Sequence, residues 1–238
     1  MVFALYFYCK APNMTTPKAI AGLLAVFFGL SSSPINAQVN LKTGYSISLV
    51  SDPAVNDIIR QYNTFYDYTK ELKNLKWMHG FEAGLRYKSG PHAFEVSYMG
   101  AYRHLRGYFT NPNGGNDIYD KVGFNVHAGG FGYQVSDGFF GIGTDIQYQW
   151  YVTKAELILP YRTFKEVQTM WATKLYLMLI LEGSSNVHFV LQPYYILPFD
   201  EYDAKPLQQF LGTAEVNYPK NKWDRWGITL LFYNGYYE

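Results

Sequence analysis

The stretch that decides the fold reads Phe140-Gly141-Ile142-Gly143-Thr144-Asp145-Ile146-Gln147-Tyr148-Gln149-Trp150. Apolar or aromatic side chains alternate here with glycine, aspartate and glutamine. This period of two is typical of a β-strand with two different faces, because successive side chains point to opposite sides of a sheet. A run of about ten residues is also what a strand tilted at about 45° needs to cross the hydrocarbon layer of a membrane.

The same alternation recurs along the chain and predicts eight strands. We expect them at residues 39–50, 77–88, 92–106, 119–135, 139–153, 167–181, 187–198 and 223–236. Short joins at 88–92, 136–138 and 182–186 alternate with long connections near 51–75, 107–120, 155–168 and 199–222. This asymmetry is typical of outer-membrane barrels, in which tight turns face the periplasm and long loops face outward. The predicted fold class is therefore all-β: an eight-stranded antiparallel transmembrane β-barrel, closed by pairing of the last strand with the first.

The composition agrees with a barrel. The chain is 48% hydrophobic and 19% aromatic, yet its mean hydropathy is only −0.16. Helical membrane proteins need spans of about 20 apolar residues, whereas a barrel needs an apolar residue only at every second position. The net charge of +1 includes no basic block, so nucleic acid is not an expected partner.

The N-terminus predicts a secretory signal. Lys18 precedes the apolar run 19–30, and Ile35-Asn36-Ala37 places a small residue before Gln38. We expect cleavage after Ala37, which makes residues 1–37 a signal peptide and 38–238 the mature barrel. Met14 is an alternative start, in which case Cys9 is not made.

The polar faces of the strands predict a lumen filled by side chains, because an eight-stranded barrel is just wide enough to hold them. The luminal polar network is expected to contain Glu82, Arg86, Glu95, Arg103, Asp145 and Lys174. The alternative for this set is a narrow ion path or a small ligand pocket. A double-mutant cycle on Arg86 and Glu95 is expected to show coupling, since the two carry opposite charges on neighbouring strands.

One segment departs from the strand pattern. Asp52-Pro53 is a typical helix start, and apolar residues then recur at helical spacing through residues 53–73. We interpret 53–73 as an amphipathic helix in the first outer loop, either a cap on the barrel rim or a recognition element. The candidate recognition residues on it are Ile58, Tyr62, Phe65 and Tyr66.

Catalytic and cofactor motifs are not found. The sequence contains no phosphate-binding loop, no dinucleotide fingerprint, no HExxH and no cysteine-based metal site. It therefore predicts no catalytic residue, no cofactor and no metal site. Small membrane barrels include lipid hydrolases and acyltransferases, so His104 near the outer rim, with Ser97 lower on the same strand, keeps an enzyme as an alternative.

These features together resemble the small eight-stranded outer-membrane barrels of the OmpA, OmpX and PorT type from Gram-negative bacteria. The segment Gly80-Phe81-Glu82-Ala83-Gly84-Leu85-Arg86-Tyr87, which follows a helical first loop, carries part of this resemblance. The chain departs from the pattern in ending with Tyr236-Tyr237-Glu238 rather than a terminal Phe. The resemblance implies an outer-membrane location in the cell envelope, contact with membrane lipid and insertion by the barrel-assembly machinery.

The sequence thus favours a monomeric, non-catalytic outer-membrane barrel with a structural or surface-recognition role, its outer loops free to bind a ligand or protein. Two other hypotheses remain open: a lipid-modifying enzyme that uses a rim histidine, and a soluble lipocalin-like ligand-binding barrel. Alternation alone does not say which face points inward, so the sequence does not separate the soluble barrel from the membrane barrel.

Overall fold

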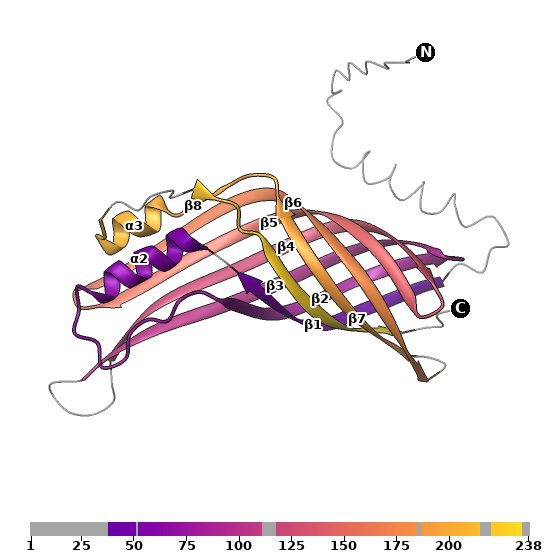
Figure 1. Ribbon diagram of the computed structural model, residues 1–238, viewed down its shortest axis with the longest axis horizontal. Coiled ribbons are helices and arrows are strands. Elements are labelled where there is room, and N and C mark those ends of the chain that lie inside the picture. Colours follow the sequence, from indigo (N-terminus) through magenta and orange to yellow (C-terminus); the bar gives the residue numbers. More distant parts are fainter. Residues whose placement is uncertain (1–37, 51, 111–117, 185–186, 215–219, 235–238) are drawn as a thin grey trace, which may run out of the picture. The chain divides into compact units, whose positions relative to one another are not determined.

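The computed structural model describes residues 38–50, 52–110, 118–184, 187–214 and 220–234 (Figure 1). The predicted signal peptide, with Met14 and Cys9, lies outside the described residues. The elements are β1 (Gln38–Val50), α2 (Pro53–Asn63), β2 (Trp77–Ser89), β3 (His92–Phe109), β4 (Ile118–Asp137), β5 (Phe140–Ile158), β6 (Tyr161–Ser184), β7 (Val187–Pro198), β8 (Tyr202–Asp203), α3 (Lys205–Leu211), β9 (Lys220–Asn221) and β10 (Arg225–Asn234).

Eight of these strands form a closed barrel in the order β1-β10-β7-β6-β5-β4-β3-β2. Every neighbouring pair is antiparallel. Strands β1 and β10 pair from Lys42–Tyr233 to Val50–Arg225, which closes the ring as predicted. Strands β8 and β9 form a separate two-stranded sheet. The predicted eight-stranded antiparallel barrel is confirmed.

The outward face of the barrel is apolar. On β5, Ile142 and Ile146 are 54% and 57% exposed, while Asp145 and Gln147 beside them are buried. Exposed apolar side chains continue around the ring and include Leu41, Ile47, Phe81, Leu85, Val96, Phe131, Leu175, Leu177, Ile228 and Leu230. Soluble monomers rarely expose an apolar patch beyond about 300–600 Å². This barrel therefore has the opposite polarity from a soluble protein.

Aromatic side chains gather toward both ends of the outward face. Near the long connections they are Trp77, Tyr102, Trp150, Trp171 and Trp226. Near the short turns they are Phe94, Tyr133, Phe140, Phe189 and Phe232. Between the two bands lie aliphatic side chains together with some aromatic ones, among them Tyr45, Phe81 and Tyr98. Aromatic side chains concentrated at two levels are typical of the interfacial belts of a membrane barrel.

Strands β3 to β6 are longer than predicted. The stretch 155–168 was expected to be a long loop, but β5 ends at Ile158 and β6 begins at Tyr161, so that only two residues connect them. The loop prediction was wrong because the segment still alternates, with Ala155 and Leu157 buried and Glu156 exposed between them. Its inward side chains pack in the apolar cluster with helices α2 and α3 and do not face the polar interior.

The first helix is shorter than the predicted 53–73. Helix α2 ends at Asn63, and residues 64–76 continue without helix. Asp52 caps the helix by accepting a hydrogen bond from the backbone N–H of Val55 at 2.9 Å, as its acidic N-cap position predicts. Figure 1 shows α2 and α3 side by side at one end of the barrel, where the outer parts of β5 and β6 run past them.

The helices close this end with an apolar core. Ile58 and Ile59 of α2 and Leu207 of α3 are buried in one cluster with Val122 and Phe124, which point inward from β4. The interior therefore has two levels, a polar one within the ring and an apolar one beneath the helices. Among the described residues, no helix is long and apolar enough to cross a membrane.

Candidate functional site

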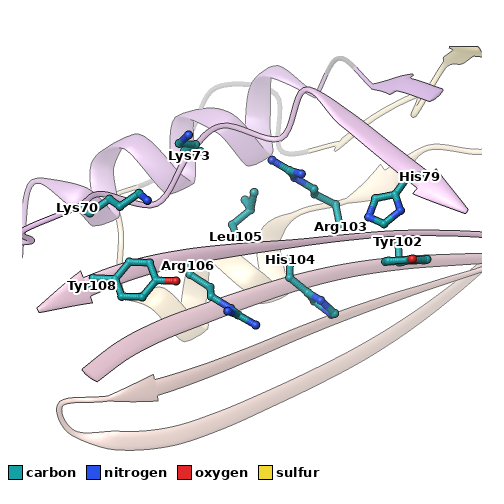
Figure 2. Close-up of a pocket in the computed structure, with 9 residues that line it drawn as sticks. All are labelled: Lys70, Lys73, His79, Tyr102, Arg103, His104, Leu105, Arg106 and Tyr108. Atoms are coloured by element: carbon teal, nitrogen blue, oxygen red, sulfur yellow. The ribbon is translucent and has the colours of Figure 1, made fainter. Parts of the chain in front are cut away.

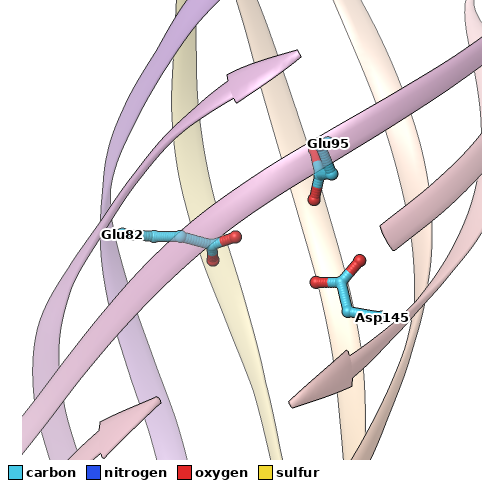
Figure 3. Close-up of side chains that lie close together, drawn as sticks. All are labelled: Glu82, Glu95 and Asp145. Atoms are coloured by element: carbon cyan, nitrogen blue, oxygen red, sulfur yellow. The ribbon is translucent and has the colours of Figure 1, made fainter. Parts of the chain in front are cut away.

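The polar interior contains three carboxylates. The side chains of Glu82, Glu95 and Asp145 approach one another so that one oxygen of each lies within 4.8 Å of the others, and all three are buried (Figure 3). Like charges at this distance repel strongly unless cations separate them. The arrangement therefore requires compensating positive charge.

Two lysines supply that charge. Lys42 Nζ lies 2.6 Å from Glu82 Oε1 and 2.7 Å from Glu95 Oε1. Lys174 Nζ lies 2.8 Å from Glu82 Oε2 and donates a hydrogen bond to Gln192 Oε1 at 2.9 Å. These ammonium groups contact both oxygens of Glu82 and one oxygen of Glu95, so this part of the cluster is a salt-bridge network rather than an ion path. Among the described residues, neither oxygen of Asp145 has a hydrogen-bond partner.

The strand register explains how the network assembles. Glu95, Gly132, Asp145 and Lys174 are consecutive cross-strand partners on β3, β4, β5 and β6. Gly132 makes room at this level, since a Cβ there would lie 1.9 Å from Asp145 Oδ1. A glycine in the second of four adjacent strands thus lets two carboxylates face each other across it.

The predicted luminal residues divide into two groups. Glu82, Arg86, Glu95, Asp145 and Lys174 are at most 1% exposed and lie inside the barrel. Arg103 lies near the outer end of β3 instead, partly exposed, with its guanidinium 3.9 Å from the centre of the Trp77 ring. The Arg103 side chain lies closer to the helix-covered end of the barrel than the salt-bridge network does, so Arg103 is not part of that network.

The predicted coupling of Arg86 with Glu95 stays a prediction. The two are cross-strand partners, but Arg86 Nη2 donates to Asn40 Oδ1 at 2.9 Å and its guanidinium lies over the Tyr233 ring. Glu95 instead contacts Lys42 of β1. Sequence reasoning missed Lys42, although its place between outward-facing Leu41 and Thr43 marks it as an inward residue.

The candidate recognition residues also divide. Ile58 and Tyr62 are 0% and 1% exposed within the core under the helices, so they cannot contact a partner from outside. Phe65 is 55% exposed, and Tyr66 packs against the edge of the core. Of the four candidate recognition residues, the accessible one, Phe65, therefore lies beyond the end of helix α2.

Two tyrosine hydroxyls join the segment 53–73 to the barrel through hydrogen bonds to Asp120 of β4. The hydroxyls of Tyr62 and Tyr68 both donate to Asp120 Oδ2, at 2.8 and 2.6 Å, while Asp120 Oδ1 accepts from the backbone N–H of Ile158. Burial raises the pKa of both tyrosines, and their contacts with Asp120 raise it further for Tyr68. They therefore stay neutral donors, and Asp120 joins α2 to the outer ends of β4 and β5.

Beyond Asn63 the chain lies along the outer end of β3. The β2–β3 ladder ends at His79–Tyr102, and the next contact along this edge is a bridge between Lys70 and Tyr108. Tyr108 N–H donates to Lys70 O at 2.8 Å. Between the two pairings the wall has an opening, the β3 window, with a volume of about 310 Å³.

The β3 window is basic (Figure 2). No carboxylate lines it. Six of its lining residues are basic: Lys70, Lys73, His79, Arg103, His104 and Arg106. Figure 2 shows Lys70 and Lys73 on the segment that follows α2 and the other side chains on or beside β3. A wider groove of about 1050 Å³ continues past Lys70 and Lys73 toward Arg60 and Lys76, with Glu71 as its acidic residue.

A second hollow adjoins the window on the other side of His104. It has a volume of about 250 Å³ and is lined by Lys121, Lys154 and Glu156 around Gly123. Gly123 faces outward between strands, and a Cβ there would lie 2.8 Å from the His104 ring. The missing side chain therefore creates this space, which we call the Gly123 hollow.

A catalytic site built on His104 and Ser97 does not form. Ser97 is buried and faces the lumen, whereas His104 is exposed and faces outward seven positions along the same strand. His92 and His127 contact the hydroxyls of Tyr133 and Tyr98 on the outward face. The described residues thus bring no serine and histidine together in the form that nucleophilic catalysis requires.

Comparisons with known proteins give distant structural similarity. No family model and no curated protein matches the chain. Ail, the attachment invasion locus protein of Yersinia pestis, solved in complex with the heparin analogue sucrose octasulfate, shares 14% identity over 83% of this chain and 97% of its own, with a TM-score of 0.44. Another structure of Ail covers 82% and 95% at 14% identity, with a TM-score of 0.41.

Neisserial surface protein A gives a comparable result, with 10% identity, coverage of 84% of this chain and 99% of its own, and a TM-score of 0.45. These values are too low to assign the chain to a family. The eight-stranded fold follows from the hydrogen-bond ladders of the chain itself, and the chain is similar to Ail and Neisserial surface protein A.

Proposed function

We propose that this protein is an integral β-barrel of a Gram-negative outer membrane, with a structural or surface-recognition role and no catalysis. The observation that carries the proposal is the inverted polarity: Ile146 and Leu177 are about half exposed, while Lys42, Glu82 and Lys174 are buried inside. In lipid this arrangement places apolar side chains against acyl chains and satisfies every strand edge within the closed ring.

The filled interior supports a role other than conduction. Lys42 and Lys174 bridge the buried carboxylates, and Gln149 accepts a hydrogen bond from Arg225 at 2.9 Å farther along the same interior. The apolar core under α2 and α3 closes the outer end. Recognition is therefore assigned to the outer surface, where the exposed basic groups lie.

The two alternatives have less support. A soluble ligand-binding barrel would place its apolar side chains inside and its charges outside, opposite to what Lys174 and Ile146 do here. A lipid-modifying enzyme would need a nucleophile beside His104, and Ser97 lies on the other face. A monomer is proposed because the eight strands complete a ring within one chain.

We propose further that residues 1–37 are a signal removed on export. The first barrel strand begins at Gln38, directly after the predicted cleavage site. Assembly in the membrane by the barrel-assembly machinery then follows export.

Cell fractionation tests the proposal. The protein should appear in the outer-membrane fraction, require detergent for extraction, migrate differently in gels when boiled and unboiled, and have the intact mass of a chain that starts at Gln38. Recovery in the soluble periplasm without heat-modifiable migration would contradict the membrane assignment.

A further inference from the structure

The outward face of β3 to β6 carries a band of basic side chains above the aromatic residues. The strand register defines two rows. His104, Gly123, Lys154 and Lys165 are consecutive cross-strand partners, and Arg106, Lys121, Glu156 and Thr163 form the row beyond them. The two rows together hold five basic residues and one acidic residue; we call them the basic band.

Two pairs within the basic band repel. Lys154 lies directly opposite Lys165, and Arg106 lies directly opposite Lys121. Like charges that face each other across neighbouring strands destabilise a sheet. The ion pairs between described residues involve Lys42, Lys174 and Arg60, and none involves the band. Glu156 lies directly opposite Lys121 and offsets one charge of the band. The band still has more positive than negative charge and no ion pair among the described residues, as expected for a surface that binds an anion.

The depth of the band favours a membrane lipid as the source of that anion. His104 follows Tyr102 by two residues on the outward face, about 6.6 Å along the strand at about 3.3 Å per residue. With a strand tilt of about 45°, this places His104 about 5 Å above Tyr102 along the membrane normal. The headgroup layer is about 5–7 Å thick on each side of the hydrocarbon, so the first row lies within it.

The two hollows provide room for the anion. The β3 window of about 310 Å³ and the Gly123 hollow of about 250 Å³ lie on either side of His104, which lines both. His104 lies beyond the segment proposed to span the bilayer. Partial desolvation of the ring lowers the pKa of His104, and the neighbouring cations Lys121, Arg106 and Lys154 lower it further.

We propose that the basic band binds the phosphate groups of a phosphorylated glycolipid headgroup in the outer leaflet. Lys121 and Lys154 contact phosphate from the Gly123 hollow, and Lys165 contacts it from its place opposite Lys154 on β6. Arg106 with Lys70 contacts phosphate from the β3 window. Acyl chains of the same lipid lie against the aliphatic face below Tyr102. This inference rests on the proposed membrane insertion.

The test compares a band variant, K121Q/K154Q/K165Q, with a matched control, K205Q/K220Q/K222Q. Both remove three lysines from the outer end, all of them exposed except the half-buried Lys121, and the control positions lie outside the band. Each folded barrel in a nonionic detergent is titrated with diphosphorylated lipid A or with its dephosphorylated form, and native mass spectrometry gives the apparent Kd. Heat-modifiable migration of each protein verifies folding.

The wild type and the control should bind the diphosphorylated lipid more tightly than the dephosphorylated one. The band variant should lose about 100-fold in affinity for the diphosphorylated form, since each Lys or Arg at a membrane surface contributes about a fivefold factor toward anionic lipid. Its affinity for the dephosphorylated form should not change. Equal binding of the two lipids by the wild type, or equal affinities of wild type and band variant, would overturn the proposal.

A soluble polyanion is the competing occupant. If a sulfated polysaccharide binds the wild type in a band-dependent manner while lipid A shows no phosphate preference, the lipid proposal is wrong. If no heat-modifiable barrel forms in detergent, the membrane assignment fails and this inference fails with it. A heat-modifiable barrel without phosphate preference would contradict this inference alone.

Discussion

The charged side chains inside the barrel contact partners on strands that are distant along the chain. Alternation along a strand places Glu82, Glu95, Asp145 and Lys174 on one face, and the structure buries all four. Which cation contacts which carboxylate depends on side chains that reach across the barrel, as Lys174 of β6 does to Glu82 of β2. Sequence neighbours carry no record of that contact, so Lys42 was missed, as were the contacts of Arg86 with Asn40 and Tyr233. The coupling of Arg86 with its cross-strand partner Glu95 stays a prediction.

The buried ion pairs give a prediction about coupling. Replacing Lys174 with Met should lower the free energy of unfolding by about 3–5 kcal/mol, because Glu82 keeps its charge in the interior with one cation fewer. The double variant E82Q/K174M should cost clearly less than the sum of its single variants. Reversible urea unfolding from lipid vesicles measures this, with the exposed Lys220→Met as a control. Additive losses would indicate that the two side chains do not interact.

The outward face gives a second prediction. Ile146→Arg should destabilise the inserted barrel by about 2–4 kcal/mol if Ile146 is near the midplane, whereas Val152→Arg, beyond Trp150, should cost about 0–1 kcal/mol. Both positions face outward on the same strand, so they differ in depth alone. The same unfolding measurement applies, and equal costs at the two positions would mean that depth in lipid is not what distinguishes them.

At the scale of elements, strand existence was predictable and strand length was not. The alternation of β5 and β6 was interpreted as ending near Thr153 and Val167, because polar and aromatic residues follow. The strands continue to Ile158 and from Tyr161 since α2 and α3 cover their inner faces. For example, Phe164 of β6 stacks on Phe210 of α3 at 5.0 Å between ring centres. Such a contact between distant segments leaves no local signal.

The sequence predicted where helix α2 begins but not where it ends. Asp52-Pro53 sets the N-cap, but the apolar spacing after Asn63 belongs to a non-helical segment whose Tyr68 and Leu72 pack on the core. A helical period and an irregular segment that buries every third or fourth side chain look alike in sequence.

Asp52 provides a test of how this element is held. Besides capping α2, its carboxylate accepts hydrogen bonds from Asn221 Nδ2 at 2.7 Å and from the buried indole N–H of Trp223. Asp52→Ala should destabilise the apolar core under α2 and α3, here called the outer core, by about 2–4 kcal/mol. Loss of the helix cap costs about 0.5–2 kcal/mol, and leaving the buried Trp223 N–H without an acceptor costs about 1–3 kcal/mol. Hydrogen exchange of the Val55 to Tyr62 amides measures the local opening.

Asp52→Asn is the matched variant, since Asn is an equally good N-cap and keeps one acceptor oxygen. It should recover the part of the protection that depends on the helix cap, whereas the Trp223 indole N–H loses its acceptor in both variants. Amides of β5 within the proposed membrane segment should exchange equally slowly in both variants. Loss of protection there as well would show that the outer core and the barrel unfold as one unit.

At the scale of the whole molecule, the sequence predicts that the strands close into a barrel, but it does not predict which face of the sheet points inward. Eight strands that leave no edge unpaired predict a ring, and β1 pairs with β10 as expected. The direction of the faces could not be predicted, because Ile146 and Gln147 alternate in the same way whether the apolar side points in or out. Only the closed ring shows that Gln147 is buried and Ile146 is exposed.

What the outward face contacts distinguishes a membrane-spanning barrel from a soluble one most directly. Single cysteines carrying a nitroxide at Ile142, Thr144 and Ile146, compared with Lys154 and Glu156 beyond the aromatic residues, report this directly in lipid vesicles. The first three labels should collide mainly with oxygen, which is soluble in lipid, and the last two mainly with a water-soluble nickel complex. Equal access of the nickel complex to all five labels would contradict a membrane-spanning barrel.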